Sequence, residues 1–184
     1  AQQQGWSDRF ALVLSNNADA GGLALAKAAG LPTAVLDHRA YGAARREAYD
    51  AALLALLRAQ DVDWVVLAGF MRVLTPVMTD AFAGRILNIH PSLLPKYPGL
   101  HTHRRVLEAG DSEHGCSVHL VDASLDGGPL LAQARVPVLP GDSEETLAAR
   151  VLEQEHVLYP RVVRAALQGS LSSADAAMIQ EGAR

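Results

Sequence analysis

The sequence is poor in several features that define other classes of protein. It has a single cysteine, Cys116, which excludes an internal disulfide and suits a reducing cytoplasm. No apolar run reaches the ~18 residues of a membrane span, and we find no signal peptide ahead of the first expected strand. A net charge of -4 argues against the broad basic surface of nucleic-acid binders. We therefore expect neither a membrane nor a nucleic acid as a partner.

The composition is that of a folded domain. The chain has 184 residues, of which 49% are hydrophobic and 20% are charged, so it is long enough to bury a core. We expect one domain over residues 1–184. The opening stretch, "AQQQGWSDRF", reads as the tail of a helix. We therefore also expect this domain to be truncated at its N-terminus.

Short apolar runs alternate with helical patterns in the first half of the chain. We expect strands at 9–15, 33–37, 62–70 and 85–89, and helices at 17–30, 43–60 and 75–84. The run 62–70 is apolar on both faces, which is typical of a strand at the centre of a parallel sheet. This alternation predicts an α/β fold with parallel strands.

The second half of the chain changes character. Two strand-like stretches, "HGCSVHLVDA" and "GPLLAQARVPVL", follow each other with no helical pattern between them, which favours an antiparallel hairpin. A long amphipathic helix is expected at 142–169, with Ser143 as its N-cap and with Pro160 as a place where it could bend or split. The predicted fold class is thus α/β, with a mixed, mostly parallel sheet flanked by helices.

Two polar residues stand where this fold would place a ligand, and an aspartate follows later in the chain. Asn88 and His90 lie at the carboxyl end of the strand expected at 85–89, and open parallel sheets bind ligands beyond that edge. Asp126 follows further along, in an Asp-Gly-Gly sequence. Turn chemistry alone would explain each motif taken by itself. Together, however, an aspartate can support an imidazolium and an asparagine can donate to an oxyanion.

These three residues form an acid–base and oxyanion set without a nucleophile. Cys116 and Ser92 are the candidates for that role, but the sequence gives neither of them an activating partner. His101 and His103 mimic a metal-binding pair, although no carboxylate or thiol lies nearby at ligand spacing, so we interpret them as loop or helix-start residues. We expect His114 and His119 to serve strand packing or to make satisfied hydrogen bonds.

Longer stretches resemble one family. "NIHPSLLPKYPGLHTHRRVLEAG", "HGCSVHLVDASLDGGPLL", "QEHVLYPRVV" and "LAGFMRVL" are similar to the phosphoribosylglycinamide formyltransferases, over about residues 15–167. The resemblance implies a Rossmann-like formyltransferase fold and formyl transfer from 10-formyltetrahydrofolate, a cosubstrate, to glycinamide ribonucleotide in purine biosynthesis. It implies small-molecule partners, no metal and no covalent enzyme intermediate.

The resemblance also implies roles for particular residues. Asn88 and His90 would flank the formyl carbonyl, with Asp126 holding His90. Glu155 would bind the ribose hydroxyls of the nucleotide. The implied folate-binding residues are Arg46, Met71, Arg72, Val73, Leu74 and Asn88. Structural alternatives are a surface pair of Arg46 with Asp50, a solvent-facing Glu155 and a simple connection at 71–74.

One family feature is missing from the sequence. Members open with a strand and a glycine-rich loop whose amides hold the substrate phosphate, and nothing of that kind occurs here. Two alternatives to the transferase stay open. One is a formyltetrahydrofolate hydrolase, which uses a similar triad with water as the acceptor, and the other, because of the missing loop, is a silent folate-binding subunit. We expect a monomer or a homodimer.

Overall fold

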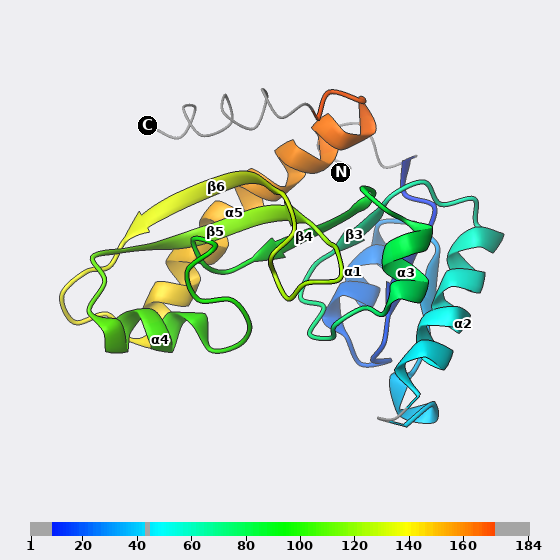
Figure 1. Ribbon diagram of the computed structural model, residues 1–184, viewed down its shortest axis with the longest axis horizontal. Helices are drawn as coiled ribbons and strands as arrows, with labels where there is room; N and C mark the ends of the chain where they lie inside the picture. Colours follow the sequence, from blue (N-terminus) through cyan, green and yellow to red (C-terminus); the bar gives the residue numbers. More distant parts are fainter. Residues whose placement is uncertain (1–8, 43–44, 172–184) are drawn as a thin grey trace. The chain divides into compact units, whose positions relative to one another are not determined.

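The computed structural model describes residues 9–42 and 45–171. The packing divides the chain into two compact units (Figure 1), and each unit is described by itself. Unit 1 comprises residues 1–63 and 74–82, and unit 2 comprises residues 64–73 and 83–184. The single domain and the truncation predicted from the sequence stay predictions.

Unit 1 is built around a two-stranded parallel sheet of β1 (Val13–Ser15) and β2 (Thr33–Val35). Helix α1 (Gly21–Ala28) connects these strands, and a short 3₁₀ helix (His38–Ala40) follows them. Helices α2 (Arg46–Ala59) and α3 (Pro76–Ala81) pack against each other. The two helices predicted before and after 33–37 are therefore confirmed, with shorter bounds.

The start of α3 is fixed by a buried carboxylate. Thr75 is the N-cap residue and Pro76 is the first helical residue, as predicted. The side chain of Thr75 makes no capping bond within α3; instead, its backbone N–H and its hydroxyl donate to Oδ2 of Asp50, at 2.6 and 2.8 Å. Asp50 is buried in α2, so its carboxylate joins the two helices.

Unit 2 contains a four-stranded mixed sheet in the order β3-β4-β5-β6. The strands are β3 (Val65–Leu67), β4 (Ile86–His90), β5 (Glu113–Leu120) and β6 (Leu130–Pro137). β3 is parallel to β4, whereas β4–β5 and β5–β6 are antiparallel. The expected hairpin is thus confirmed, and the parallel and antiparallel pairs together confirm the mixed α/β fold class.

Two helices complete unit 2. Helix α5 (Glu144–Leu167) packs against β4, β5 and β6 and also contacts α4 (Thr102–Ala109), as Figure 1 shows. Ser143 caps α5 through a capping box with Thr146, as the start signal predicts. The helix continues through Pro160 without a break. Among the described residues, no helix is long and apolar enough to cross a membrane.

The two faces of β5 have different surroundings. Successive side chains of a strand point to opposite faces, so Cys116 and Val118 share one face and Ser117 and His119 share the other. Cys116 lies on the side of α5, since Glu155 of α5 is its charged neighbour. Ser117 and His119 instead bond to the loop after β4 and to Asn88. The core and the polar cluster therefore lie on opposite sides of the same strand.

A pair of imidazoles joins α4 to β5. Nε2 of His114 lies 3.0 Å from Nδ1 of His103, so one ring donates a proton and the other accepts it. His114 is 1% exposed, and burial, followed by the charge of His103, lowers the pKa of His114 to about 4. The neutral form of His114 is thus the one that the folded protein stabilises.

This pair predicts a loss of stability in acid. Because the pKa of His114 falls from 6.5 in the unfolded chain to about 4 in the fold, its contribution is complete above pH 6.5 and is lost as the pH falls toward 4. We expect on the order of 2–3 kcal/mol less free energy of unfolding at pH 4 than at pH 7 from this residue. Urea unfolding of the wild type and of His114→Gln at both pH values measures it. Equal pH dependence in the two proteins would contradict the assignment.

Candidate active site

The register of β4 against β5 assembles the polar cluster. Asn88 and His90 lie two residues apart on β4 and therefore share a face of the sheet. In the antiparallel pair, His119 stands directly opposite Asn88 and Ser117 directly opposite His90. Four polar side chains from two strands are thus placed side by side at the end of β4.

Asp126 reaches this cluster from the loop between β5 and β6. The loop is closed at its base by a hydrogen bond from the N–H of Leu120 to the carbonyl of Pro129, at 2.9 Å. Only glycine fits at position 128, since a Cβ there would lie 2.0 Å from the carbonyl oxygen of Leu120. Asp126 itself has a positive φ of 50°, which aspartate tolerates better than most residues. The Asp-Gly-Gly sequence thus lies in a bent loop that brings a carboxylate to the cluster.

The imidazole of His90 lies between two acceptors. Its Nε2 donates to the carbonyl oxygen of Tyr97 at 2.9 Å, and its Nδ1 lies 3.4 Å from Oδ2 of Asp126. A carbonyl can only accept, so Nε2 carries a proton; a neutral ring would then turn the lone pair of Nδ1 toward the carboxylate. The doubly protonated ring meets both acceptors with N–H groups. Asp126 is thus the acceptor available to a proton on Nδ1.

The carboxylate of Asp126 is itself held in place. Its Oδ2 accepts a hydrogen bond from the backbone N–H of Gly99, at 2.8 Å. The side chain is 13% exposed and that of His90 is 7% exposed, so water screens their interaction only weakly. The structure therefore brings together His90 and Asp126, the pair predicted from the sequence.

His119 is a member of the cluster that the sequence interpretation missed. Its Nδ1 lies 2.9 Å from the carbonyl of Leu120 and must donate to it, which leaves Nε2 as the acceptor of a hydrogen bond from Nδ2 of Asn88, at 3.1 Å. Burial lowers the pKa of His119, so the neutral ring that this pattern requires is the stable form at neutral pH. The alternation of "HGCSVHL" places His119 on a face with Ser117, but only the pairing with β4 shows that Asn88 is opposite.

The bond to His119 orients the amide of Asn88. One N–H of Nδ2 is taken up by His119, and the second N–H of the same group is left to donate to a ligand. An amide N–H fixed in this way needs no reorientation when a negative oxygen develops beside it. Asn88 therefore has the geometry of an oxyanion donor.

The structure offers no support for Cys116 or Ser92 as a nucleophile. Cys116 is fully buried on the α5 side of β5, and burial raises the pKa of its thiol to about 12. Ser92 is also fully buried, and its hydroxyl donates to the carbonyl of Lys96 at 2.7 Å. Without a nucleophile, the cluster offers only groups that donate or accept protons, which suits a reaction in which one substrate attacks the other directly.

The predicted folate segment follows β3 as an exposed stretch. Met71 is 74% exposed and Val73 is 46% exposed, Arg72 is half-buried, and Leu74 is buried. Exposed apolar side chains such as these suit contact with a flat heterocycle. Leu74, in contrast, offers little of its side chain to a ligand.

The two remaining predicted binding residues lie on helices. Arg46 is the first residue of α2 in unit 1 and is exposed. Glu155 lies in α5, where burial raises its pKa, and its titratable neighbours are His156 and Cys116. Their roles stay predictions.

The other histidines lie where the sequence interpretation expects structural residues. His101 precedes α4 as its N-cap and His103 lies in its first turn, so both are helix-start residues. Within the residues that the structure describes, no three histidine, cysteine or acidic side chains are grouped so that they could hold a metal ion.

Comparisons with known proteins point to one family. A family model described as formyl transferase matches residues 1–163. The phosphoribosylglycinamide formyltransferase of Escherichia coli (strain K12) is 53% identical over 94% of this chain and 80% of its own length. The enzyme of that name from Haemophilus influenzae is 48% identical over 91% of this chain and 78% of its own.

A solved structure shows the same fold. Glycinamide ribonucleotide transformylase 1 from Symbiobacterium toebii superposes with a TM-score of 0.83 at 49% identity, covering 86% of this chain and 74% of that one. The class of protein is therefore that of the formyl transferases. Within this class, the chain belongs to the phosphoribosylglycinamide formyltransferase family.

The burial of Cys116 gives a direct test of the described site. With a pKa of about 12 instead of 9.0, the thiolate fraction at pH 8 is lower by roughly a thousandfold. We expect iodoacetamide to label the folded protein slower by at least that factor than the protein in urea, as followed by intact mass. Rapid labelling of the folded protein would show that Cys116 is accessible and activated, and Cys116 would again be a candidate nucleophile.

Proposed function

We propose that this protein transfers a formyl group from 10-formyltetrahydrofolate to the amine of glycinamide ribonucleotide, a step of purine biosynthesis. The family supports this activity. The observation that carries the proposed mechanism is the placement of His90 between Asp126 and the carbonyl of Tyr97, beside the oriented amide of Asn88. We further propose a cytoplasmic enzyme that is a monomer or a homodimer.

The reaction that suits these residues is direct attack. The lone pair of the substrate amine forms a bond to the formyl carbon, and the carbonyl π electrons move to oxygen. Collapse of this tetrahedral species breaks the bond to the folate nitrogen, N10. The proton that the amine loses is gained by N10, so the products are the formylated amine and tetrahydrofolate. No covalent bond to the enzyme is needed.

The cluster supplies what each step needs. The free N–H of Asn88 and a protonated His90 would stabilise the negative oxygen, which is a contribution of several kcal/mol in a water-poor site. Asp126 would keep His90 charged and correctly oriented. Proton transfer from the amine to N10 would run through His90 or through a water molecule held by Asp126.

The binding residues complete the proposal. The exposed segment at Met71, Arg72 and Val73, with the backbone of Leu74, would hold the pterin ring. Arg46 would meet an anionic part of the folate. Glu155 would accept hydrogen bonds from the ribose hydroxyls, and its location in a partly buried stretch of α5 supports a role beyond surface charge.

The activity is tested by following the release of folate with and without the acceptor. Purified protein is given 10-formyltetrahydrofolate, and tetrahydrofolate is measured in the presence and in the absence of glycinamide ribonucleotide. We expect release only with the acceptor, together with the formylated ribonucleotide as product. Release without the acceptor would indicate a hydrolase, and tight folate binding without turnover would indicate a silent subunit; both results would refute the proposal.

The pairing of His90 with Asp126 predicts the effect of Asp126→Asn. Removal of the negative charge disfavours the imidazolium, so we expect kcat to fall by roughly 10²-fold and the alkaline limb of the pH–rate profile to move to lower pH. The KM for the folate should change little. Asp122→Asn is the matched control: it removes a carboxylate from the same loop, and its amide oxygen can still accept from Ser124. An unchanged profile in Asp126→Asn would contradict the pairing.

A further inference from the structure

The carbonyl group that holds His90 comes from a residue in an unusual backbone conformation. Tyr97 has a positive φ of 55°, a region that bulky aromatic residues rarely adopt. This conformation points its carbonyl oxygen at Nε2 of His90, seven residues earlier in the chain. Because the backbone alone disfavours it, other contacts must hold Tyr97 in place.

Those contacts converge on the ring and hydroxyl of Tyr97. Its Oη donates to Oδ2 of Asp111 at 2.9 Å, and Nζ of Lys96 donates to the same oxygen at 2.8 Å. On the ring itself, the guanidinium of Arg105 lies 5.2 Å from the centroid, and Arg105 also donates to the carbonyl of Pro98 at 2.7 Å. We name Tyr97, Lys96 and Asp111 the Tyr97 anchor.

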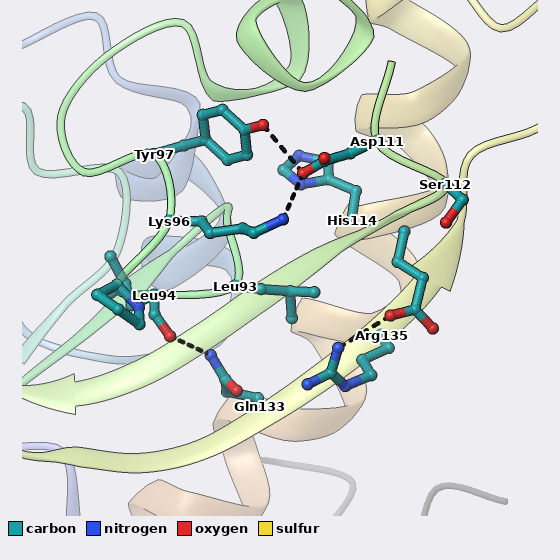
Figure 2. A pocket seen from close by; sticks show the side chains of 11 residues that line it. Leu93, Leu94, Lys96, Tyr97, Asp111, Ser112, His114, Gln133 and Arg135 are labelled. Atoms are coloured by element: carbon teal, nitrogen blue, oxygen red, sulfur yellow. Dashed lines mark hydrogen bonds and ion pairs between the residues drawn. The ribbon is translucent and has the colours of Figure 1, made fainter. Parts of the chain in front are cut away.

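The anchor lines a pocket of about 290 Å³. Figure 2 shows Lys96 and Tyr97 both reaching Asp111. A second ion pair, from Arg135 to Glu113 at 3.0 Å, lines the same pocket and does not include Tyr97. Since both of its side chains are about 60% exposed, that pair contributes little to stability. It provides a matched control for changes in the anchor.

We propose that Tyr97 is a positioning residue for the reaction: its carbonyl, held by Asp111, occupies Nε2 of His90 and thereby assigns proton transfer to Nδ1. This inference rests on the proposed function for its catalytic meaning. Proton transfer then runs through Nδ1, beside Asp126, either directly or through a water molecule that Asp126 holds. Without the anchor, the ring of His90 would be free to place its proton on either nitrogen.

The order of the contacts explains why a side chain at the surface would matter to a buried imidazole. The hydroxyl of Tyr97 fixes the loop, the loop fixes the carbonyl, and the carbonyl fixes the tautomer of His90. In the neutral ring the bond to Tyr97 keeps the proton on Nε2, whereas Asp126 attracts it to Nδ1. Loss of the anchor should therefore shift the neutral ring toward the Nδ1–H form.

The first experiment measures which ring nitrogen of His90 is protonated, and it does not depend on catalysis. Imidazole ¹⁵N spectra of the folded protein report which ring nitrogen is protonated, and His90→Gln assigns the signal. We expect an Nε2–H ring in the neutral state of the wild type, and a mixture of both tautomers in Tyr97→Phe and in Asp111→Ala. In contrast, Asp111→Asn keeps an oxygen that accepts from Tyr97 and should retain the wild-type spectrum, as should Arg135→Gln.

The second experiment measures formyl transfer in the same variants. In Tyr97→Phe and Asp111→Ala we expect kcat to fall by roughly tenfold, with the KM values of both substrates within about twofold of the wild type. Asp111→Asn should restore most of the rate, and Arg135→Gln should leave it unchanged. A purely structural loop would give a raised KM or a lower melting temperature with no selective loss of kcat.

The outcomes separate this inference from the proposed function. An unchanged His90 spectrum in folded Tyr97→Phe overturns the positioning role, even if formyl transfer is confirmed. A shifted spectrum in a protein that transfers no formyl group supports the control of the tautomer and refutes the activity. A rise in KM with kcat unchanged would assign the loop to substrate binding and would also overturn the inference.

Discussion

The antiparallel pairing of β4 with β5 is the constraint on which the candidate site depends. It sets His119 opposite Asn88 and Ser117 opposite His90. Ser117 also accepts a hydrogen bond from the N–H of Leu94 and donates to the carbonyl of Ser92, so the chain that leaves β4 is tied back to β5. The same pairing therefore places the reactive side chains and shapes the loop that returns Tyr97 to His90.

Two imidazoles lie beside one carboxylate, and the protein treats them differently. His119 has a backbone carbonyl on Nδ1 and an amide donor on Nε2, which a neutral ring satisfies. His90 has acceptors on both sides, which a charged ring satisfies. Because the hydrogen-bond partners differ, one ring orients the amide of Asn88, while the other presents both of its nitrogens to acceptors.

Much of the fold could be predicted from the sequence, since the order of strands and helices follows from apolar periodicity, and the starts of α3 and α5 follow from Thr75-Pro76 and Ser143. Strand lengths could not: the apolar run 62–70 pairs only over Val65–Leu67. Within the site, Asn88, His90 and Asp126 stand in motifs that sequence reasoning can find. The role of His119 could not be predicted, because it depends on the register between two strands that are distant in sequence. The role of Tyr97 could not be predicted either, because it acts through its backbone carbonyl, a group that every residue has.

The opposite faces of β5 carry a consequence for how such a chain can vary. One face holds Cys116 and Val118 in the apolar interior, and the other holds the polar side chains that meet β4. Insertion or deletion of a single residue inside β5 would move the residues beyond it to the opposite face, so that imidazole would lie under α5 or an apolar side chain would lie in the polar cluster. The ladder with β6 already contains a one-residue shift in register between Val118 and His119, whereas the ladder with β4, which sets the polar cluster, is continuous from Leu87 to His90. A change of length in β5 is therefore most disruptive on the side that faces β4.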